Sequence, residues 1–534
     1  MRLSSPSGLK ALPCAFVFFL AGCGGGGYSG SMGTMGKGNT MGTGGYGSNP
    51  PPMSMGSSTM SMGSSTMSMG STMSMGSTMS MGNTMARGGH GSNPPPMPTV
   101  TFSSLTQAST IHMGQAVKLA WTSSNAASCS ASTSSDIGGA FSGSQSTSGS
   151  VTVAPVGTGT VKYTLSCRGS GGTGMANTAA VTVLPSILSM LSPTKITTIG
   201  STIDPIEHRN NPYGLAIAPV TVAHLGVTAG DLIACNFNDG STMTQGRGTT
   251  IVGLRPTPGA MPYRVAQSSS LQGCSALAIF PDGSISATAF SANQVPLVAP
   301  DGTMGTPFST DTFAGPWGQA YVAANGQNPA ALYVSTADGK IARITLSGDT
   351  QTAFTPIVSG FCGSGHPGRI YAPAGLTYDS SVDTLYVIDT SSFSVIALAN
   401  VSGIGASGVT VAGQCRSTTR APTPMPTFSG PSASSASVIA HGAPLFAPLS
   451  AALLADGDLI VENSDINIPS GQMPNLAVEV SPVLPGGFVG QPVQLDTSGT
   501  PGALFGIVAT VDGQGNQIIY FNDDRANTVM RMTR

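Results

Sequence analysis

Short apolar stretches recur through the C-terminal two thirds of the chain, separated by small or polar residues typical of turns. One unit reads Pro373-Ala-Gly-Leu-Thr-Tyr, then Leu385-Tyr-Val-Ile-Asp, then Phe393-Ser-Val-Ile-Ala-Leu. Related triplets surround Pro316-Trp-Gly-Gln-Ala-Tyr and Gly506-Ile-Val-Ala-Thr. A repeated unit of this size is typical of radial or stacked repeat architectures. The pattern therefore predicts an all-β repeat array.

Six such units are aligned within residues 187–534. Their first strands are led by Gly214, Ser275, Gly318, Gly375, Ser450 and Gly506. Small residues there suit a crowded axis on which several strands converge. The last unit stops after its third strand, and an unpaired strand edge favours aggregation. We therefore expect residues 194–202 to supply the missing outer strand and close the ring.

The pattern Pro-x-Gly-Leu followed by Leu-Tyr-Val-x-Asp resembles the NHL-repeat β-propellers over roughly residues 190–534, and the resemblance implies six blades. Six-bladed relatives include gluconolactonase-type hydrolases and peptide-amidating lyases, which hold a divalent metal on the axis. Glu207, Asn236, Asp389 and Asp465 could be given that role here, but their placement does not repeat the family pattern. The resemblance therefore implies the fold and not the chemistry.

Residues 99–184 show a different pattern, in which apolar and polar residues alternate along short strands. Leu119 and Trp121 lie on one face of such a strand, and Ser/Thr/Gly clusters separate it from the next. This alternation predicts a two-sheet β-sandwich. The segments 119–129 and 163–167 resemble the immunoglobulin-like modules of bacterial surface proteins. The resemblance implies a spacer or adhesive stalk.

Residues 1–22 have the pattern of a lipoprotein signal peptide. Their apolar stretch, residues 11–20, is too short to span a membrane as a mature helix. The segment Leu20-Ala-Gly-Cys23 resembles the bacterial lipobox, whose cysteine is lipidated and becomes the new N-terminus. The sequence thus predicts lipidation at Cys23 and, with Gly24 following, an outer-membrane anchor in the cell envelope, facing the periplasm or the surface.

Residues 23–98 are a low-complexity segment rich in Met, Gly and Ser, and we expect a disordered tether. Its Met-x-Met pairs, such as Met60/Met62 and Met73/Met75, offer the soft thioether ligands that suit Cu(I) or Ag(I). Metal sequestration by the tether is therefore one hypothesis. The alternative is the expansion of a simple repeat in a weakly constrained linker.

Apart from Cys23, the predicted mature chain contains six cysteines, an even number that fits a disulfide-bonded exported protein. We expect three disulfides, which are Cys129–Cys167, Cys235–Cys274 and Cys362–Cys415. Cys235 ends a predicted second strand and Cys274 begins the next blade. Cys362 and Cys415 are expected in equivalent loops before consecutive blades. For any one pair, the alternative is two buried free thiols.

No motif of an established catalytic class occurs in the sequence, such as G-x-S-x-G or H-E-x-x-H. Three histidines precede first strands, in loops expected to border the axial mouth. With neighbouring side chains they could form a polar pocket, and three imidazoles could bind a metal. The candidate pocket comprises His208, Asn211, Tyr213, His366, Arg369, Tyr371 and His441. The alternative is that these are solvated loop residues in unrelated positions.

Charged residues make up only 8% of the chain and the formal net charge is −2, which argues against a nucleic-acid partner. Three hypotheses remain. The favoured one is an envelope-anchored propeller that binds a protein, peptide or glycan without a cofactor or catalytic residues. The others are a hydrolase or lyase with an axial divalent metal, and Cu(I) or Ag(I) sequestration by the tether.

Overall fold

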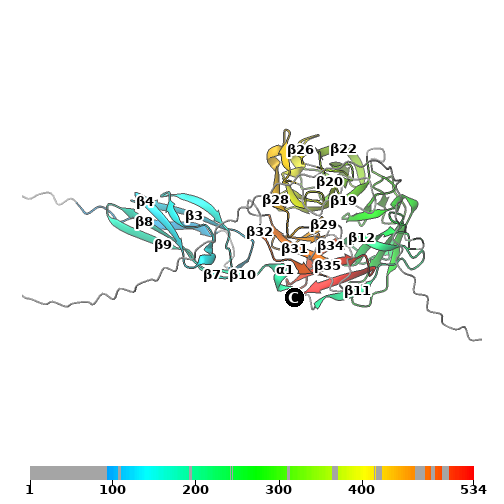
Figure 1. Cartoon of the computed structure of the whole chain (residues 1–534), viewed down its shortest axis with the longest axis horizontal. Helices are drawn as coiled ribbons and strands as arrows, with labels where there is room; N and C mark the ends of the chain where they lie inside the picture. The colour runs from blue at the N-terminus through cyan, green and yellow to red at the C-terminus, as the bar shows by residue number, and fades with distance from the viewer. Residues whose placement is uncertain are drawn as a thin grey trace, which may run out of the picture. The chain divides into compact units, whose positions relative to one another are not determined.

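The described part of the chain is almost entirely β-structure in this computed structural model (Figure 1). The chain divides into two compact units, residues 1–89 and 90–534. The described residues all belong to the second unit, and they are 93–105, 110–191, 195–240, 242, 244–308, 313–363, 371–413, 415, 424–463, 475–482, 488–495 and 504–534. Cys23 and the Met-x-Met pairs lie outside them. Among these residues no helix has the length and apolarity needed to cross a membrane.

Residues 99–184 form a β-sandwich in which three sheets share one core. The sheets are β1 (Thr99–Leu105), β3 (Val117–Ser124) and β6 (Gly149–Val153); β2 (Thr110–His112), β10 (Val181–Leu184) and β7 (Gly159–Val161); and β5 (Gly143–Gln145), β4 (Ser128–Thr133), β8 (Tyr163–Gly169) and β9 (Gly172–Asn177). The ring of Phe141 packs edge-on against Trp121 and Tyr163 at the centre. The disulfide Cys129–Cys167 joins directly opposed residues of β4 and β8.

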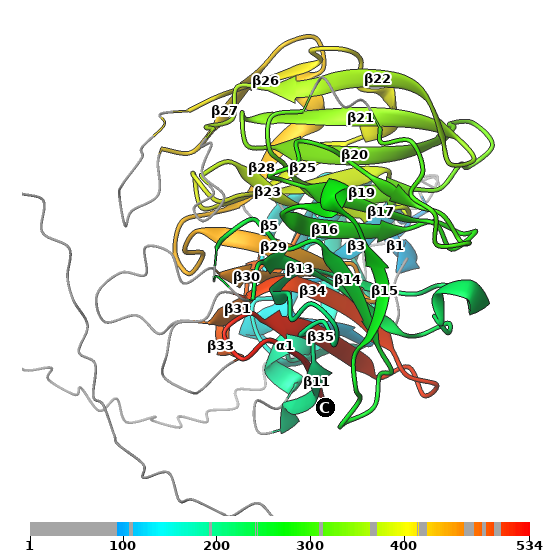
Figure 2. The same ribbon diagram turned by 90° about the vertical axis from the view of Figure 1, so that its right-hand side faces the viewer.

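The remaining strands form a six-bladed β-propeller (Figures 1 and 2). Blades 1 to 3 are β12 (Asn210–Ile217), β13 (Leu232–Asn238), β14 (Thr250–Leu254) and β15 (Tyr263–Gln267); β16 (Cys274–Ile279), β17 (Ile285–Ala289) and β18 (Leu297–Val298); and β19 (Pro316–Val322), β20 (Ala330–Thr336), β21 (Lys340–Ser347) and β22 (Thr350–Ser359). Blades 4 and 5 are β23 (Pro373–Asp379), β24 (Thr384–Asp389), β25 (Ser394–Ala399) and β28 (Ala436–His441); and β29 (Pro448–Leu453), β30 (Leu459–Asn463), β31 (Leu476–Ser481) and β32 (Phe488–Val489), with β33 (Val493–Gln494) beside β31.

Blade 6 joins the beginning of the propeller to its end. It consists of β34 (Leu504–Val511), β35 (Gln517–Asp523) and β36 (Thr528–Thr533), with β11 (Thr197–Ser201) as its outer strand. β11 pairs antiparallel with β36, and in Figure 1 it lies against the red C-terminal strands. Each first strand contacts those of the blades before and after it, and β34 contacts β12. The predicted closure is therefore confirmed, over a slightly shorter segment than residues 194–202.

The first strands approach each other closely around the axis, as the small residues predicted. A Cβ atom added to Gly318 would lie under 3.0 Å from Ala374 O of the next blade, and one added to Gly506 would lie under 3.0 Å from Tyr213 O. Every first strand also has a register shift near its beginning. The inner strands leave no space for larger side chains at these positions.

Side chains near the ends of second strands fasten neighbouring blades together. In each case a hydroxyl or amide group donates to a backbone carbonyl of the next blade's first strand. The pairs are Thr288 to Trp317, Ser335 to Ala374, Thr390 to Pro448 and Asn522 to Tyr213. The disulfide Cys235–Cys274 adds a covalent link between blades 1 and 2.

Blade 3 differs from the predicted pattern. Its sheet continues through β26 (Val409–Ala412) and β27 (Thr427–Ser429), which leave blade 4 between β25 and β28. The disulfide Cys362–Cys415 forms as predicted, but the predicted position of Cys415 was wrong. Cys415 follows β26 and does not lie in a loop before a blade, because the β26–β27 insertion has no counterpart in the repeat.

Substitution of Gly318 by Ala should destabilise the propeller by at least about 2 kcal/mol, because the new Cβ atom meets the backbone of the next blade. Urea unfolding monitored by tryptophan fluorescence would measure the loss. Gly513→Ala is the matched control, since a Cβ atom there has nothing within 4 Å. Equal stability of the two variants would contradict the close axial packing.

Candidate functional site

The axis of the propeller contains a cavity lined by all six first strands. Its volume is about 80 Å³. A site for a drug-sized ligand usually has a volume of about 300–1,000 Å³. Among the described residues that line the cavity there is no Asp, Glu, His, Lys or Arg. The cavity is therefore too small for a substrate of that size and offers no charged side chain.

Aromatic side chains fill the end of the axis at which the chain enters each first strand. We call this end the mouth face; among the described residues it includes the loop before β12 and the turns that carry Arg247, after β13, and Arg525, after β35. Tyr213 stacks on Phe505 and Phe237, with ring centroids 3.6 and 4.2 Å apart. Trp317 packs edge-on against Phe237 and Phe290. The mouth thus has an apolar, largely buried aromatic floor.

Of the five predicted pocket residues that the structure describes, one lines this cavity. Tyr213 lines it, whereas His208, Asn211, Tyr371 and His441 are not among its lining residues. Asn211 Nδ2 donates to Asp524 Oδ2 over 3.0 Å, which links blade 1 to blade 6. His441 Nδ1 lies 3.0 Å from Ser394 Oγ within blade 4. The two remaining members, His366 and Arg369, lie outside the described residues.

The described residues considered as axial metal ligands do not line the axial cavity. Asn236 Nδ2 donates to Thr202 O and to Thr250 Oγ1, whereas its Oδ1 atom is buried without a partner. Asp389 accepts hydrogen bonds from hydroxyl groups in the turn after β24. Glu207 pairs with Arg209 in the loop before β12. Asp465 lies outside the described residues. None of the three described residues, Glu207, Asn236 and Asp389, is among the residues that line the axial cavity.

A charged network orders the loop before β12 on the mouth face. Asp204 is fully buried and receives two hydrogen bonds from Arg264, at 2.9 and 2.5 Å, and two from the backbone of Ile206 and Glu207. Burial alone would raise the pKa of Asp204, but these donors outweigh it and lower the pKa. Arg209 extends the network to Asp239, which follows β13, at a distance of 2.6 Å. Sequence reasoning missed it because Asp204 and Arg264 are far apart in the chain.

Glu462 is a buried carboxyl group that the sequence did not single out. Opposite the register shift of the first strand, the second strand of five blades carries a polar side chain that is fully buried. These residues are Asn236, Thr288, Ser335, Glu462 and Asn522. The Ser450 hydroxyl, at the cavity wall, donates to Glu462 Oε2 over 2.7 Å, while Oε1 has no partner. Burial raises the pKa of Glu462 to about 8. The protonated acid can donate a hydrogen bond, as the hydroxyl and amide groups of other blades do.

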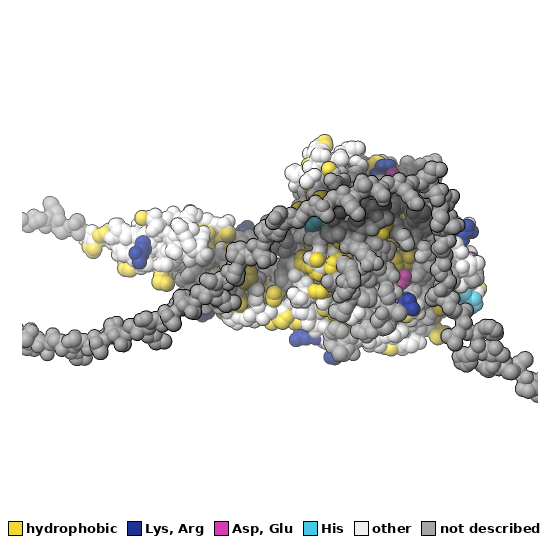
Figure 3. Space-filling model, viewed as in Figure 1, with side chains coloured by type: hydrophobic (Ala, Val, Ile, Leu, Met, Phe, Trp, Pro, Cys, Tyr) yellow, Lys and Arg dark blue, Asp and Glu magenta, His cyan; other side chains and the backbone are white. Residues whose placement is uncertain are grey.

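Charged side chains are sparse on the face shown in Figure 3 and do not gather into a basic patch there. The low charged fraction of the sequence is thus visible as isolated positions. A phosphate backbone binds to clusters of Lys and Arg.

No protein-family model matches the chain, and no curated protein sequence matches it. Solved structures do resemble it. A virginiamycin B lyase from Staphylococcus aureus, crystallised with quinupristin, is 14% identical at a TM-score of 0.36, covering 64% of this chain and 99% of the lyase. A nidogen/laminin complex is 13% identical at a TM-score of 0.37, covering 56% of this chain and 85% of the other chain. The PQQ domain of a pyranose dehydrogenase from Coprinopsis cinerea is 12% identical at a TM-score of 0.39, covering 64% of this chain and 95% of the domain. Likenesses this low carry no argument about ligands or chemistry.

Replacing Glu462 by Gln should flatten part of the pH dependence of stability. The folded-state pKa lies above the unfolded value, so the native protein binds more protons between about pH 5 and pH 8 and loses stability as pH rises through that range. Gln keeps the shape and cannot ionise. The stability of the variant relative to wild type should therefore increase by up to about 1.4 kcal/mol per pH unit. Urea unfolding at several pH values would measure the unfolding free energy of both proteins. A difference between variant and wild type that stays constant with pH would contradict the prediction.

Proposed function

We propose that the chain is a lipid-anchored protein of the cell envelope whose propeller is a rigid platform, binding a protein, peptide or glycan through the mouth face. The observation that supports this most is the axis itself. Its cavity of about 80 Å³ has no charged side chain among the described lining residues, and aromatic rings fill its mouth. We therefore place the binding surface on the mouth face around this cavity, where Arg247 and Arg525 are exposed.

Several features make this platform rigid. β11 closes the ring, side chains link neighbouring blades, and Cys235–Cys274 joins two blades covalently. The Asp204–Arg264 network fixes one of the loops on the mouth face. A surface that is ordered before binding loses less conformational entropy on association. Such a scaffold suits recognition by loops of different shapes.

The enzyme hypothesis has less support. An axial hydrolase or lyase needs carboxylate, amide or imidazole ligands that converge on a divalent metal. Among the described residues, none of the proposed ligands lines the axial cavity.

Metal sequestration by the tether stays a hypothesis. Deleting residues 53–85 should abolish Cu(I) binding if that hypothesis is correct.

The lipid anchor rests on the segment Leu20-Ala-Gly-Cys23. Cys23→Ser should prevent lipidation and release the protein from the membrane fraction, since the acyl chains supply the affinity for the bilayer. Membrane fractionation and mass spectrometry of the N-terminal peptide would measure both effects. Cys14→Ser is the matched control and should remain membrane-bound. An unmodified Cys23 in the wild-type protein would contradict the anchor.

A photo-crosslinking amino acid placed on each face would test the platform. Arg247 and Arg525 are exposed in turns of the mouth face, and Val382 and Gln514 are exposed in hairpins at the opposite end. In cells, crosslinked adducts should form from the first two positions and not from the second two. Equal crosslinking from both faces, or crosslinking from the opposite face alone, would overturn the assignment of the binding surface.

A further inference from the structure

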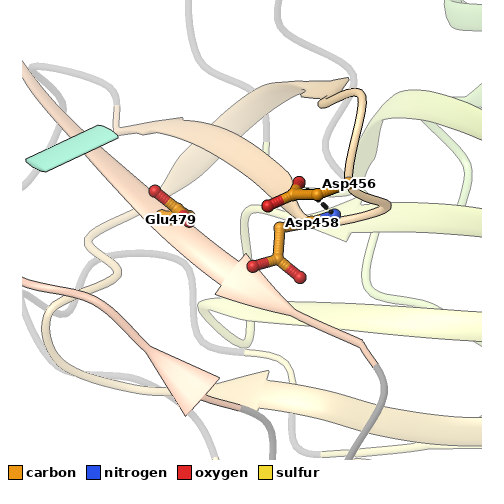
Figure 4. Close-up of side chains that lie close together, drawn as sticks. All are labelled: Asp456, Asp458 and Glu479. Carbon is orange, nitrogen blue, oxygen red and sulfur yellow. Dashed lines mark hydrogen bonds between the residues drawn. The ribbon is translucent and has the colours of Figure 1, made fainter. Parts of the chain in front are cut away.

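Three carboxylate side chains converge within blade 5, away from the axial cavity. Asp456 and Asp458 lie at the turn between β29 and β30, and Glu479 lies on β31, which pairs with β30. One carboxylate oxygen from each residue lies within 4.8 Å of the others. Figure 4 shows the three side chains together, with the hydrogen bond from the Asp458 backbone N–H to Asp456 drawn as a dashed line.

Asp458 is fully buried, yet neither of its oxygens has a hydrogen-bond partner. The Ser481 hydroxyl and the Glu479 carboxyl group lie close by, but neither meets the geometry of a hydrogen bond to it. The Oδ2 atom of the partly buried Asp456 also lacks a partner. Of the ion pairs among the described residues, none includes these three carboxylates. The His112 imidazole interacts electrostatically with Asp456, but Asp458 and Glu479 form no ion pair with a cationic group among the described residues.

Other hairpins of the propeller show what this turn lacks. In blade 2 the corresponding turn begins with Asp282, whose Oδ2 accepts a hydrogen bond from the Ser284 hydroxyl over 2.9 Å. In blade 6 the Oδ2 atom of Asp512 accepts from the Asn516 amide, also over 2.9 Å. In blade 5 the place of the donor is taken by Asp458, a second carboxylate. The donor or positive charge that the Asp456 carboxylate needs therefore does not come from this turn.

Glu479 is already held in place by backbone donors. Its Oε1 and Oε2 atoms accept hydrogen bonds from Ile187 N at 3.1 Å and Leu188 N at 2.5 Å, the first residues of α1 (Ile187–Met190). Through these bonds the carboxylate joins α1 to blade 5. α1 precedes β11, the strand that closes the ring.

An ionised carboxylate costs several kcal/mol to bury without compensation, so three of them side by side require a cation or protons. Ligand atoms that are all oxygen suit a hard cation. Two oxygens that bind the same calcium ion lie at most about 4.8 Å apart, twice the usual bond length of about 2.4 Å.

We propose that Asp456, Asp458 and Glu479 bind one calcium ion, which fastens the β29–β30 turn and α1 to blade 5. The partly exposed Asp456 leaves the site a route to solvent. Water or backbone carbonyl groups complete the coordination. The ion replaces the hydroxyl or amide donor of the other hairpins and adds a link between the blades and the segment that leads into β11.

Thermal unfolding of the mature chain with and without calcium tests the site. After treatment with a chelator, addition of calcium to about 10 mM should raise the Tm by about 2–4 °C for a dissociation constant between about 1 and 0.1 mM. Sodium chloride at matched ionic strength should not do so. Isothermal titration calorimetry should give one calcium per chain.

Asp458→Ser introduces the arrangement of blade 2 and removes a ligand. This variant should fold, as far-UV circular dichroism would show, and should lose both the Tm response and the calorimetric signal. Asp512→Asn, in the exposed hairpin of blade 6, is the matched control and should keep them. A wild-type protein that does not respond to calcium, or an Asp458→Ser variant that responds as fully as wild type, would overturn the proposal. The first result would leave protons as the groups that neutralise the cluster.

Discussion

The close approach of six first strands around one axis determines most of this structure. At Gly318 and Gly506 the neighbouring backbone occupies the space that a side chain would need. The register shift at the beginning of each first strand lets polar groups of the second strand reach the next blade. The blades are thus fixed to one another by backbone contacts and short hydrogen bonds as well as by apolar packing. Because the same constraint repeats around the ring, a change in one blade is felt by its neighbours.

The same constraint shapes the chemistry that the axis can support. Space not taken by the strands is filled at the mouth by Tyr213, Trp317 and Phe505, and the remaining cavity is small. The polar side chains near it are mostly engaged in holding blades together. The proposed binding surface therefore lies on the surface loops, where sequence can vary without disturbing the axis. Buried carboxyl groups, by contrast, lie on the strands and in the turn of blade 5, as Glu462, Glu479 and Asp458 do.

Features marked by a repeated motif were predicted well from the sequence. The six first strands, the strand that closes the ring and the three disulfide pairs follow from short motifs, small residues and an even number of cysteines. Features that no motif marks were missed. The β26–β27 insertion has no counterpart in the repeat, and the contacts of Asp204 with Arg264 and of Glu479 with α1 join segments far apart in the chain. The proposed histidine pocket assumed that loops of similar position converge, whereas aromatic residues occupy the axis.

The pairing of β11 with β36 also has a consequence for how the molecule forms. Thr197 lies opposite Arg531, so the contact that completes the circle joins residues near the two ends of the propeller segment. Such non-local contacts slow folding, because a long loop of chain must be ordered before they form. Until β36 has been synthesised, β11 has no strand to pair with. A polypeptide still emerging from the ribosome or a translocation channel thus cannot complete this fold before β36 is available. A chaperone that covers β11 until then would protect its unpaired edge.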